Sequence, residues 1–478
     1  MVPSSSVTQV CERNKRAGGG DRCQQVAALH GQVAQRRSNA ILAPALELQT
    51  QALSPRTSST MTPIPQDPLW ESTLALLGDP YRYIGSRCRQ LGTSLFEARI
   101  LLRKTLCMSG SEAAAVFHQE EFFSRVGAAP EPMRNTLLGN GGVQGLDAEA
   151  HRRRKALFLS LMTPERTEQL VALVVERWHD AARQWEGEVS LYDALHGVLT
   201  RAACQWAGVP LPEADARQRT RELTALFDAA GAIGFRHLWA RFARWRADNW
   251  AEGIIRAIRS GNYWPPESSA AHAIAFHVEP NGEHLPARVA AVELLNVVRP
   301  VVAVSVFLVF TALALHRHPE CRERLLNEPE YAEWFAHEVR RFFPFFPALT
   351  ALVRKDFEWK GYRLRKGRWT LLDVYGTNHD PRVWENPEAF RPERFQNRPV
   401  DLFGFIPQGG GDAKQTHRCP GERPTIELMK ATALLLAGQM TYRVPEQDLS
   451  VDMSRLPALP KSRLVIRDVR MRPAHLAT

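Results

Sequence analysis

The sequence has few of the features that mark secreted or membrane-spanning proteins. Its 478 residues include only seven cysteines, an odd number at irregular spacings, with no Cys-x-x-Cys pair. Neither a disulfide framework nor a zinc site is therefore indicated. The longest apolar run, Val301–Leu315, is shorter than the ~18–20 residues that a membrane span requires, and no N-terminal apolar stretch could serve as an anchor or secretory signal. These absences predict a cytoplasmic protein with no membrane anchor.

Acidic residues are fewer than basic ones, 51 against 61, which gives a net charge of +10. An excess of positive charge can indicate a nucleic-acid partner. The basic residues are scattered, however, with no aromatic-interleaved stripe and no nucleic-acid motif. We therefore interpret the charge as an arginine-rich solvated surface and expect no nucleic-acid partner.

Residues 1–60 contain no Phe, Trp or Tyr, and seven Lys and Arg accompany only three Asp and Glu. Such a segment cannot bury enough apolar area to order itself. An arginine-rich, acid-poor start also resembles a mitochondrial transit peptide. We favour a disordered extension or a product of an upstream start codon, and we expect a single folded domain over residues 61–478.

Helical periodicity dominates the rest of the chain. Thr163-Pro164-Glu165 is a typical helix start, with a capping hydroxyl followed by proline at the first helical position. The pattern predicts helices at about 164–185, 190–207, 213–230, 236–260, 286–316, 330–343 and 420–439. Strands are expected at Ala351–Trp359, Trp369–Val374, Met440–Val444 and Arg463–Arg470. The expected fold is mainly α with a small β-rich side.

A glycine-rich loop, Phe405–Glu422 (FIPQGGGDAKQTHRCPGE), places Cys419 directly before an apolar helix. The helix dipole and free backbone N–H groups stabilise a thiolate at such a position. The glycines let the backbone approach a bulky group. A buried structural cysteine is the alternative on these residues alone.

Two further motifs stand upstream of this loop. Glu338 and Arg341 share a helix face at spacing i, i+3, and Phe390–Phe395 reads Phe-Arg-Pro-Glu-Arg-Phe, with Arg394 as its second arginine. In this order the three motifs resemble the heme-thiolate (cytochrome P-450) superfamily, over about residues 63–470. The resemblance implies that superfamily's mainly helical fold in one catalytic domain. It also implies heme b, with Cys419 as the iron ligand whose thiolate favours O–O cleavage, and a structural network of Glu338, Arg341 and Arg394.

The departures from the superfamily pattern are informative. The usual arginine two residues before the cysteine is replaced by His417. The usual acid and threonine of the distal helix, which deliver protons when electrons come from a redox partner, are replaced by Asn296-Val-Val-Arg299-Pro300. Arg299 interrupts an apolar helix, and an unpartnered buried guanidinium costs roughly several kcal/mol. It is therefore either one half of an internal ion pair or a bidentate site for a carboxylate.

Arg-Pro at this place resembles the fatty-acid peroxygenase branch of the superfamily. The resemblance implies that Arg299 binds the carboxylate of a fatty acid, with Pro300 and Leu138 beside the substrate. The substrate carboxylate then supplies the missing acid–base group, hydrogen peroxide is the second substrate, and no redox partner is obligatory. Hydroxylating members carry glutamine where this chain has Gln144, and an alkene-forming member carries histidine.

The resemblance further implies that heme propionates meet four basic side chains: His151, Lys155, Arg125 and His417. A solvated basic cluster is the alternative for residues 152–155. We predict hydrogen-peroxide-dependent hydroxylation of fatty acids at the α and/or β carbon. The alternatives are a redox-partner-dependent monooxygenase, a decarboxylase that gives terminal alkenes, and a non-catalytic heme or fatty-acid binding protein.

Overall fold

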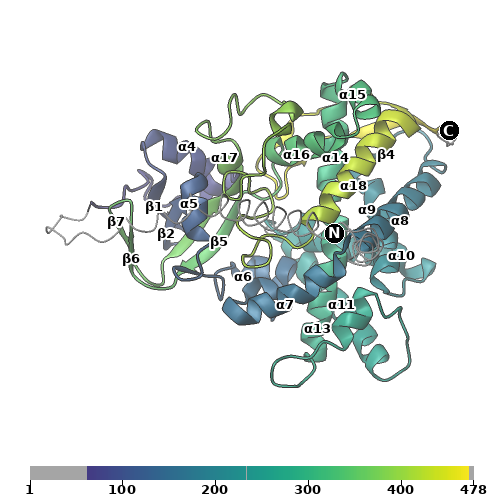
Figure 1. Cartoon of the computed structure of the whole chain (residues 1–478), viewed down its shortest axis with the longest axis horizontal. Coiled ribbons are helices and arrows are strands. Elements are labelled where there is room, and N and C mark those ends of the chain that lie inside the picture. Colours follow the sequence, from purple (N-terminus) through teal and green to yellow (C-terminus); the bar gives the residue numbers. More distant parts are fainter. Residues whose placement is uncertain (1–61, 233, 473–478) are drawn as a thin grey trace, which may run out of the picture. The chain divides into compact units, whose positions relative to one another are not determined.

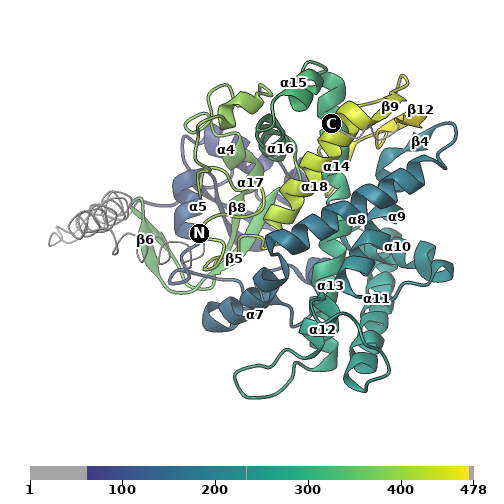
Figure 2. The ribbon, with the colours of Figure 1, turned by 45° about the vertical axis from the view of Figure 1, so that its right-hand side comes forward.

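The structure, a computed structural model, describes residues 62–232 and 234–472. From Thr62 onward the chain forms one compact unit. The predicted extension over residues 1–60 lies outside the described residues, so its nature stays a prediction. Figure 1 shows the unit coloured along the sequence, and Figure 2 shows the same ribbon turned about the vertical axis.

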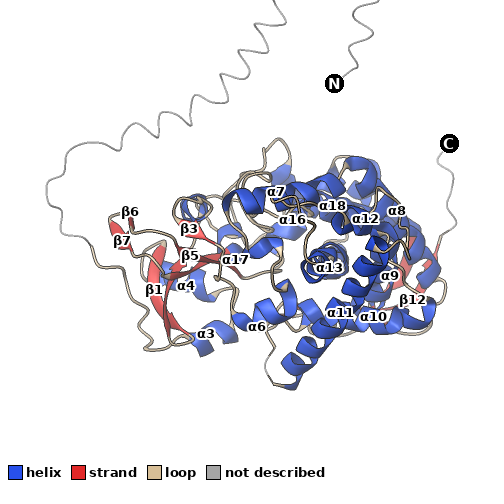
Figure 3. Ribbon diagram, turned by 90° about the horizontal axis from the view of Figure 1, so that it is seen from below, coloured by secondary structure: helices blue, strands red, loops and turns tan. Residues whose placement is uncertain are grey.

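Among the described residues the strands form a five-stranded sheet at one side (Figure 3), a three-stranded sheet of order β4-β12-β9, and the two pairs β10-β11 and β6-β7. The five-stranded sheet has the order β1-β2-β8-β5-β3. β2 and β8 are parallel, and the other neighbouring strands of this sheet are antiparallel. Its strands are β1 (Leu95–Ile100), β2 (Arg103–Met108), β3 (Phe123–Ser124), β5 (Ala348–Val353) and β8 (Trp369–Asp373). The others are β4 (Val189–Ser190), β6 (Phe357–Trp359), β7 (Tyr362–Leu364), β9 (Met440–Arg443), β10 (Val451–Asp452), β11 (Leu459–Pro460) and β12 (Val465–Met471).

Helices make up most of the remaining unit. The long ones are α7 (Ala148–Leu161), α8 (Pro164–Ala182), α9 (Leu191–Ala207), α10 (Glu213–Asp228), α11 (Phe235–Arg259), α13 (Ala287–Ala303), α14 (Ser305–Arg317), α16 (Tyr331–Phe342) and α18 (Glu422–Leu434). The shorter ones are α3 (Thr73–Gly78), α4 (Tyr83–Gln90), α5 (Ser111–Phe117), α6 (Glu131–Met133), α12 (Ala270–Ala275), α15 (Cys321–Asn327) and α17 (Val374–Asn378). The predicted helix start is confirmed, because the Thr163 hydroxyl accepts the backbone N–H of Arg166 at 3.3 Å.

An apolar helix, α13, lies at the centre of the helical side. It packs against α9, α10, α11 and α12, which lie to its right and below it in Figure 3. The predicted single helix over 286–316 is wrong in one respect: it is divided at Val304, one turn after Pro300. Ala287–Arg317 is apolar and long enough to cross a membrane, but 94% of its most apolar window is buried inside the protein. It is therefore the core helix of this unit.

Two further differences from the sequence prediction concern the sheet. The expected strand Ala351–Trp359 is two strands, β5 and β6, that belong to different sheets. The hairpin β1–β2 was not predicted. Its turn is made by Leu101 and Leu102, both with positive φ (50° and 60°). Glycine and asparagine are the usual residues at such positions, so the sequence carries no turn signal there.

Candidate active site

A cavity is lined by both the Cys419 loop and helix α13. It holds about 1660 Å³ of space that protein atoms do not fill, its opening to solvent included. Most of the predicted site residues line it: Cys419, Arg299, Pro300, Gln144, Leu138, His151, Lys155 and His417. Leucine, valine and phenylalanine side chains make up much of the remaining wall, as suits an alkyl chain. Arg125, Glu338, Arg341 and Arg394 are not among the lining residues.

Cys419 ends a tightly folded loop just before α18. Its backbone N–H donates to the carbonyl of Gln408 at 2.9 Å. Gly409 has φ +94°, and a Cβ there would lie 3.1 Å from the Arg418 Cα, so a glycine is required at this close approach. Burial raises the pKa of the Cys419 thiol, although the N–H of Gly421 acts in the opposite direction. A bound metal ion would favour the thiolate form of Cys419.

A second charged group supports this loop and was missed by the sequence analysis. Arg340 is buried and forms an ion pair with Glu422, the first residue of α18. Its Nε also donates to the side chain of Gln408 at 3.1 Å. Glu422 pairs in addition with Arg418 at 2.5 Å. Arg340 thus joins α16 to both ends of the Cys419 loop.

Arg299 lies in α13 with little to balance its charge. It is 6% exposed, and its side chain makes one hydrogen bond, from Nη2 to the Asn296 Oδ1 at 3.2 Å. Its Nε has no hydrogen-bond partner among the residues that the structure describes. Burial, assisted by the charge of Arg244, lowers the pKa of Arg299 to about 9. Because no carboxylate of the described residues forms an ion pair with it, the internal ion-pair alternative is not what the structure contains.

Asn296 connects Arg299 to a chain of charges that the sequence analysis also missed. Its Nδ2 donates to the Glu293 Oε2 at 2.9 Å. Glu293 is 0% exposed and pairs through Oε1 with the Arg154 Nη1 at 2.7 Å. Arg154 in turn pairs at 2.5 Å with Glu279, which is partly exposed. An acid in an apolar helix, three residues before Asn296, was the available signal in the sequence.

Two of the side chains expected to contact the heme propionates lie against each other. The His151 and His417 rings are stacked, with centroids 3.7 Å apart and 19° between planes. Burial lowers the pKa of His151 to about 4 and that of His417 to about 2, so both rings are neutral. The His151 Nδ1 has no hydrogen-bond partner, while the His417 Nε2 donates to the carbonyl of Leu146 at 2.9 Å.

The two cations of this group have protein partners. The Lys155 ammonium donates to the carbonyls of Thr416 and Arg418, and burial lowers its pKa to about 8. Arg125 donates to the carbonyl of Thr350 at 2.5 Å. Lys155 therefore fastens the Cys419 loop to α7, and contact of either side chain with a propionate stays a prediction.

Gln144 and Leu138 stand on irregular turns next to α13. Gln144 belongs to a 3-10 turn, and its Oε1 accepts the Asn296 Nδ2 at 3.2 Å. Leu138 ends a π-helical turn. Gly139 follows with φ +81°, and a Cβ there would lie 2.1 Å from the Arg244 Nη2. A side chain at position 139 would therefore clash with Arg244.

Glu338, Arg341 and Arg394 lie together outside the cavity. Arg341 forms two parallel bonds to Glu338, both of 2.8 Å, and Arg394 adds a contact of 3.1 Å from Nε. The backbone N–H of Arg391 also donates to Glu338, at 2.8 Å. The structure thus brings together the three residues expected to form a network, and it ties α16 to the segment that precedes the Cys419 loop.

The residues around the cavity fit a heme. Cys419 lines the cavity, and at Gly409 of the same loop a side chain would not fit. Among the described residues the His151 Nδ1 has no hydrogen-bond partner, and the positive charges of Lys155 and Arg125 act on this ring. These features fit heme, whose iron Cys419 would hold and whose acidic propionates would meet polar and basic side chains.

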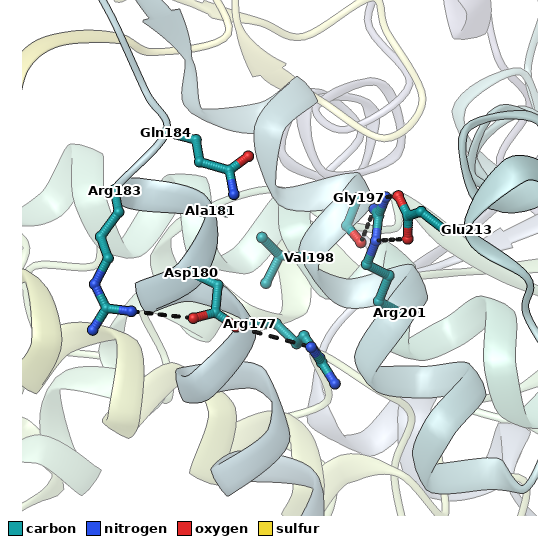
Figure 4. A pocket seen from close by; sticks show the side chains of 9 residues that line it. All are labelled: Arg177, Asp180, Ala181, Arg183, Gln184, Gly197, Val198, Arg201 and Glu213. Carbon is teal, nitrogen blue, oxygen red and sulfur yellow. Dashed lines mark hydrogen bonds and ion pairs between the residues drawn. The ribbon is translucent and has the colours of Figure 1, made fainter.

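A second hollow in the molecule has a different character. It lies between α8 and α9 and is lined by Arg177, Asp180, Ala181, Arg183, Gln184, Gly197, Val198, Arg201 and Glu213. Its charged side chains pair with one another, as Figure 4 shows for Arg183 with Asp180 and for Arg201 with Glu213. None of the predicted site residues lines this hollow, and each of its arginines has a carboxylate partner, with Asp180 shared by Arg177 and Arg183.

Comparison with known proteins identifies the family. The family model for Cytochrome P450 matches residues 311–436. Cytochrome P450SP alpha (CYP152B1) in complex with (R)-ibuprophen is 51% identical, with a TM-score of 0.83 over 84% of this chain and 99% of that chain. Cytochrome P450EX alpha (CYP152N1) with myristic acid is 40% identical, with a TM-score of 0.83 over 86% and 100%. An OleT variant in complex with arachidonic acid is 35% identical, with a TM-score of 0.84 over 87% and 100%.

Curated proteins match over shorter segments. Cytochrome P450 71A8 of Mentha piperita is 28% identical over 184 residues, which are 34% of this chain and 36% of that protein. Cytochrome P450 3A5 of Homo sapiens is 28% identical over 159 residues, 29% and 31% of the two chains. The matching segment thus spans about a third of these two relatives, whereas the solved structures match over their full length. The chain belongs to the cytochrome P450 family.

Proposed function

We propose that this protein is a peroxygenase that hydroxylates fatty acids at the α and/or β carbon with hydrogen peroxide. One observation carries the proposal: Arg299 is a buried cation with no carboxylate partner among the described residues, and it lines the same cavity as Cys419. The similar structures support the substrate class, because two of them contain myristic acid and arachidonic acid.

Heme b is the cofactor, with Cys419 as its ligand, and when bound it supplies the oxidising chemistry that follows cleavage of the peroxide O–O bond. The protein contributes the position of the substrate. Arg299 is a planar donor suited to a carboxylate, and Asn296 holds it through a bond of 3.2 Å. A fatty acid bound by its carboxylate presents its first carbons at a fixed distance from that end, which is an orientation effect.

The same carboxylate provides the proton-transfer group that α13 does not. The residues that line the cavity from this helix are Asn296, Val297, Arg299, Pro300, Val301 and Ala303, none of which is an acid or an alcohol. A substrate carboxylate bound to Arg299 accepts a proton and returns it within the cavity. Hydrogen peroxide already holds its oxygen at the level to which two electrons from a redox partner would reduce O2, so this enzyme needs no redox partner.

Gln144 supports hydroxylation over alkene formation. Its amide accepts from Asn296 at 3.2 Å and so stands beside the side chain that holds Arg299. A neutral amide at this place has no titratable proton to give to the substrate. We infer that oxidation ends in a hydroxylated acid.

We also propose that the enzyme is cytoplasmic.

Incubation of the purified holoenzyme with myristic acid and hydrogen peroxide, without reductase, tests the proposal. We expect 2- or 3-hydroxymyristic acid by mass spectrometry. Turnover that requires NADPH and a ferredoxin would identify a redox-partner-dependent monooxygenase, and a terminal alkene as main product would identify a decarboxylase. Binding of myristic acid without any product would leave a non-catalytic binding protein.

A further inference from the structure

Helix α11 exposes a row of large apolar side chains near its beginning. The five members of this row, which we call the α11 stripe, are between 46% and 90% exposed: Phe235, Leu238, Trp239, Phe242 and Trp245. Their spacing of three and four residues places them on one face of the helix. Such a face is typical of a helix that is covered by something.

The α11 stripe is continuous. The Trp239 and Phe242 ring centroids are 5.8 Å apart, and Phe242 stacks on Trp245 with the same separation. From Phe235 to Trp245 the helix rises by ~15 Å. Contiguous exposed apolar patches of this kind are rare on monomeric proteins and mark interaction sites.

The stripe is not the face by which α11 packs into the protein. Ala240, Ala243, Ala247 and Ala251 are wholly buried, and the helix contacts α10 and α13. The first half of α11 is therefore apolar on two faces. Only one of them is used for folding within the described residues, and the other is available to a partner.

The charges next to the stripe indicate the kind of partner. Residues 229–247 contain four arginines and neither aspartate nor glutamate. Arg244 and Arg246 are paired with carboxylates inside the protein, whereas Arg236 and Arg241 are exposed. Arg236 lies 3.7 Å from the Asp228 carboxylate and donates to the Asp228 carbonyl at 3.4 Å. Aromatic rings flanked by arginines on one helix are typical of segments that lie in the interface of a bilayer with anionic lipids.

We propose that the α11 stripe docks the enzyme on an anionic lipid membrane. A second copy of the chain fits this surface less well, because a two-fold contact would bring the same arginines together. The stripe rests on the surface without spanning the bilayer, so docking needs no anchor.

If the protein oxidises fatty acids as proposed above, the position of the stripe explains how docking would help the substrate to reach the cavity. Phe227 at the end of α10 and Pro457 both line the active-site cavity. Between α10 and α11, a Cβ on Gly231 would lie 2.7 Å from Leu456, so this connection packs against the cavity wall. Docking through α11 therefore brings that end of the cavity close to the lipid in which fatty acids dissolve. Docking itself does not depend on turnover.

Sedimentation of the full-length holoenzyme with lipid vesicles tests the proposal. We expect binding to vesicles that contain phosphatidylglycerol to be about ten-fold tighter than to pure phosphatidylcholine, and to weaken at about 1 M salt, where the screening length is ~3 Å. Trp239→Ser/Phe242→Ser should weaken binding by roughly ten-fold or more. Trp264→Ser is the matched control, because Trp264 is 72% exposed but lies outside the stripe.

The heme–thiolate spectrum of each variant provides the folding control, and vesicle binding is read without any turnover. The proposal is overturned if the full-length protein does not bind anionic vesicles. It is equally overturned if the double variant binds as tightly as the wild type. A third contrary outcome is a wild-type dimer, seen by light scattering, that the double variant converts to a monomer without any wild-type binding to vesicles.

Discussion

Two buried arginines, Arg341 and Arg299, show how differently one side chain is accommodated in this protein. Arg341 is 0% exposed and has a bidentate bond to Glu338, with further bonds to the carbonyls of Asn378 and Ala389. Arg299 has one bond, to a neutral amide. Because a buried charge without a counter-charge costs roughly several kcal/mol, the first arrangement is complete by itself. The second is completed only by an anion that comes from outside.

The largest loss of stability is expected when Arg341 loses its counter-charge. Glu338→Ala leaves Arg341 and Arg394 buried without their shared carboxylate, which should destabilise the protein by about 3–5 kcal/mol. Urea unfolding and the yield of heme-loaded protein would measure this. Glu149→Ala is the control, because it removes a carboxylate that pairs with two arginines at the surface and should change little. Equal stability of the two variants would contradict a structural role for Glu338.

A smaller effect, on substrate affinity, is expected when Arg299 loses its hydrogen bond to Asn296. Asn296→Ala removes the side-chain hydrogen bond to Arg299 and should weaken myristic-acid binding by about ten-fold, equivalent to about 1.4 kcal/mol. The spectral shift on substrate addition measures this affinity. Asn249→Ala is the matched control, because Asn249 accepts a bond of 2.8 Å from Arg288 outside the cavity. Unchanged affinity in Asn296→Ala would show that Arg299 does not depend on this partner.

Buried histidines show a third arrangement, in which a titratable group stays neutral. Burial lowers the pKa of His118 to about 3 and that of His379 to about 3. Since both values are below the ~6.5 of an unfolded histidine, the unfolded state takes up protons first as pH falls. The free energy of unfolding should therefore fall between about pH 6.5 and pH 3, by up to about 1.4 kcal/mol per pH unit for each such proton.

His118→Gln tests this by urea unfolding at several pH values. The His118 Nε2 accepts the backbone N–H of Gly410 at 3.1 Å, so the variant also loses a support of the Cys419 loop. We expect lower stability at neutral pH and a shallower loss toward acid. A slope as steep as that of the wild type would show that His118 does not titrate in this range.

A change outside both arginine regions should have the smallest effect. A protein that starts at Met61 is expected to bind heme and to turn over like the full-length chain, because residues 1–60 show no core-forming pattern. The heme content per chain and the peroxide-driven rate measure this. Loss of heme binding would show that the first 60 residues contribute to the fold.

Local motifs account for what the sequence could predict. Cys419, Glu338 and Arg341 are identified by motifs that resemble those of the heme-thiolate superfamily, and the helix over Pro164–Ala182 by its cap and period. The hairpin at Leu101 and Leu102 has no turn residue, so its fold depends on pairing with β8, which is distant in sequence. The missing counter-charge of Arg299 is likewise a property of everything packed around it. Spacing along the chain cannot show such an absence.

The sequence also could not predict ion pairs between residues that lie far apart along the chain. Arg340 and Glu422 are 82 residues apart, and Arg154 and Glu293 are 139 residues apart. Each pair is recognisable only after the helices have packed. The charge of Glu293 within an apolar helix was visible, but the side chain that balances it was not.

The central claim is that Arg299 is an unpaired cation that binds the carboxylate of the substrate. Arg299→Ala tests it most directly, with peroxide-driven hydroxylation of myristic acid and urea unfolding measured on the same preparation. The account predicts an intact heme–thiolate spectrum, stability equal to or above that of the wild type, and loss of nearly all hydroxylation. A short carboxylic acid should promote oxidation of a substrate without a carboxylate in the wild type and do little in the variant. Hydroxylation of myristic acid by Arg299→Ala at the wild-type rate would contradict the account.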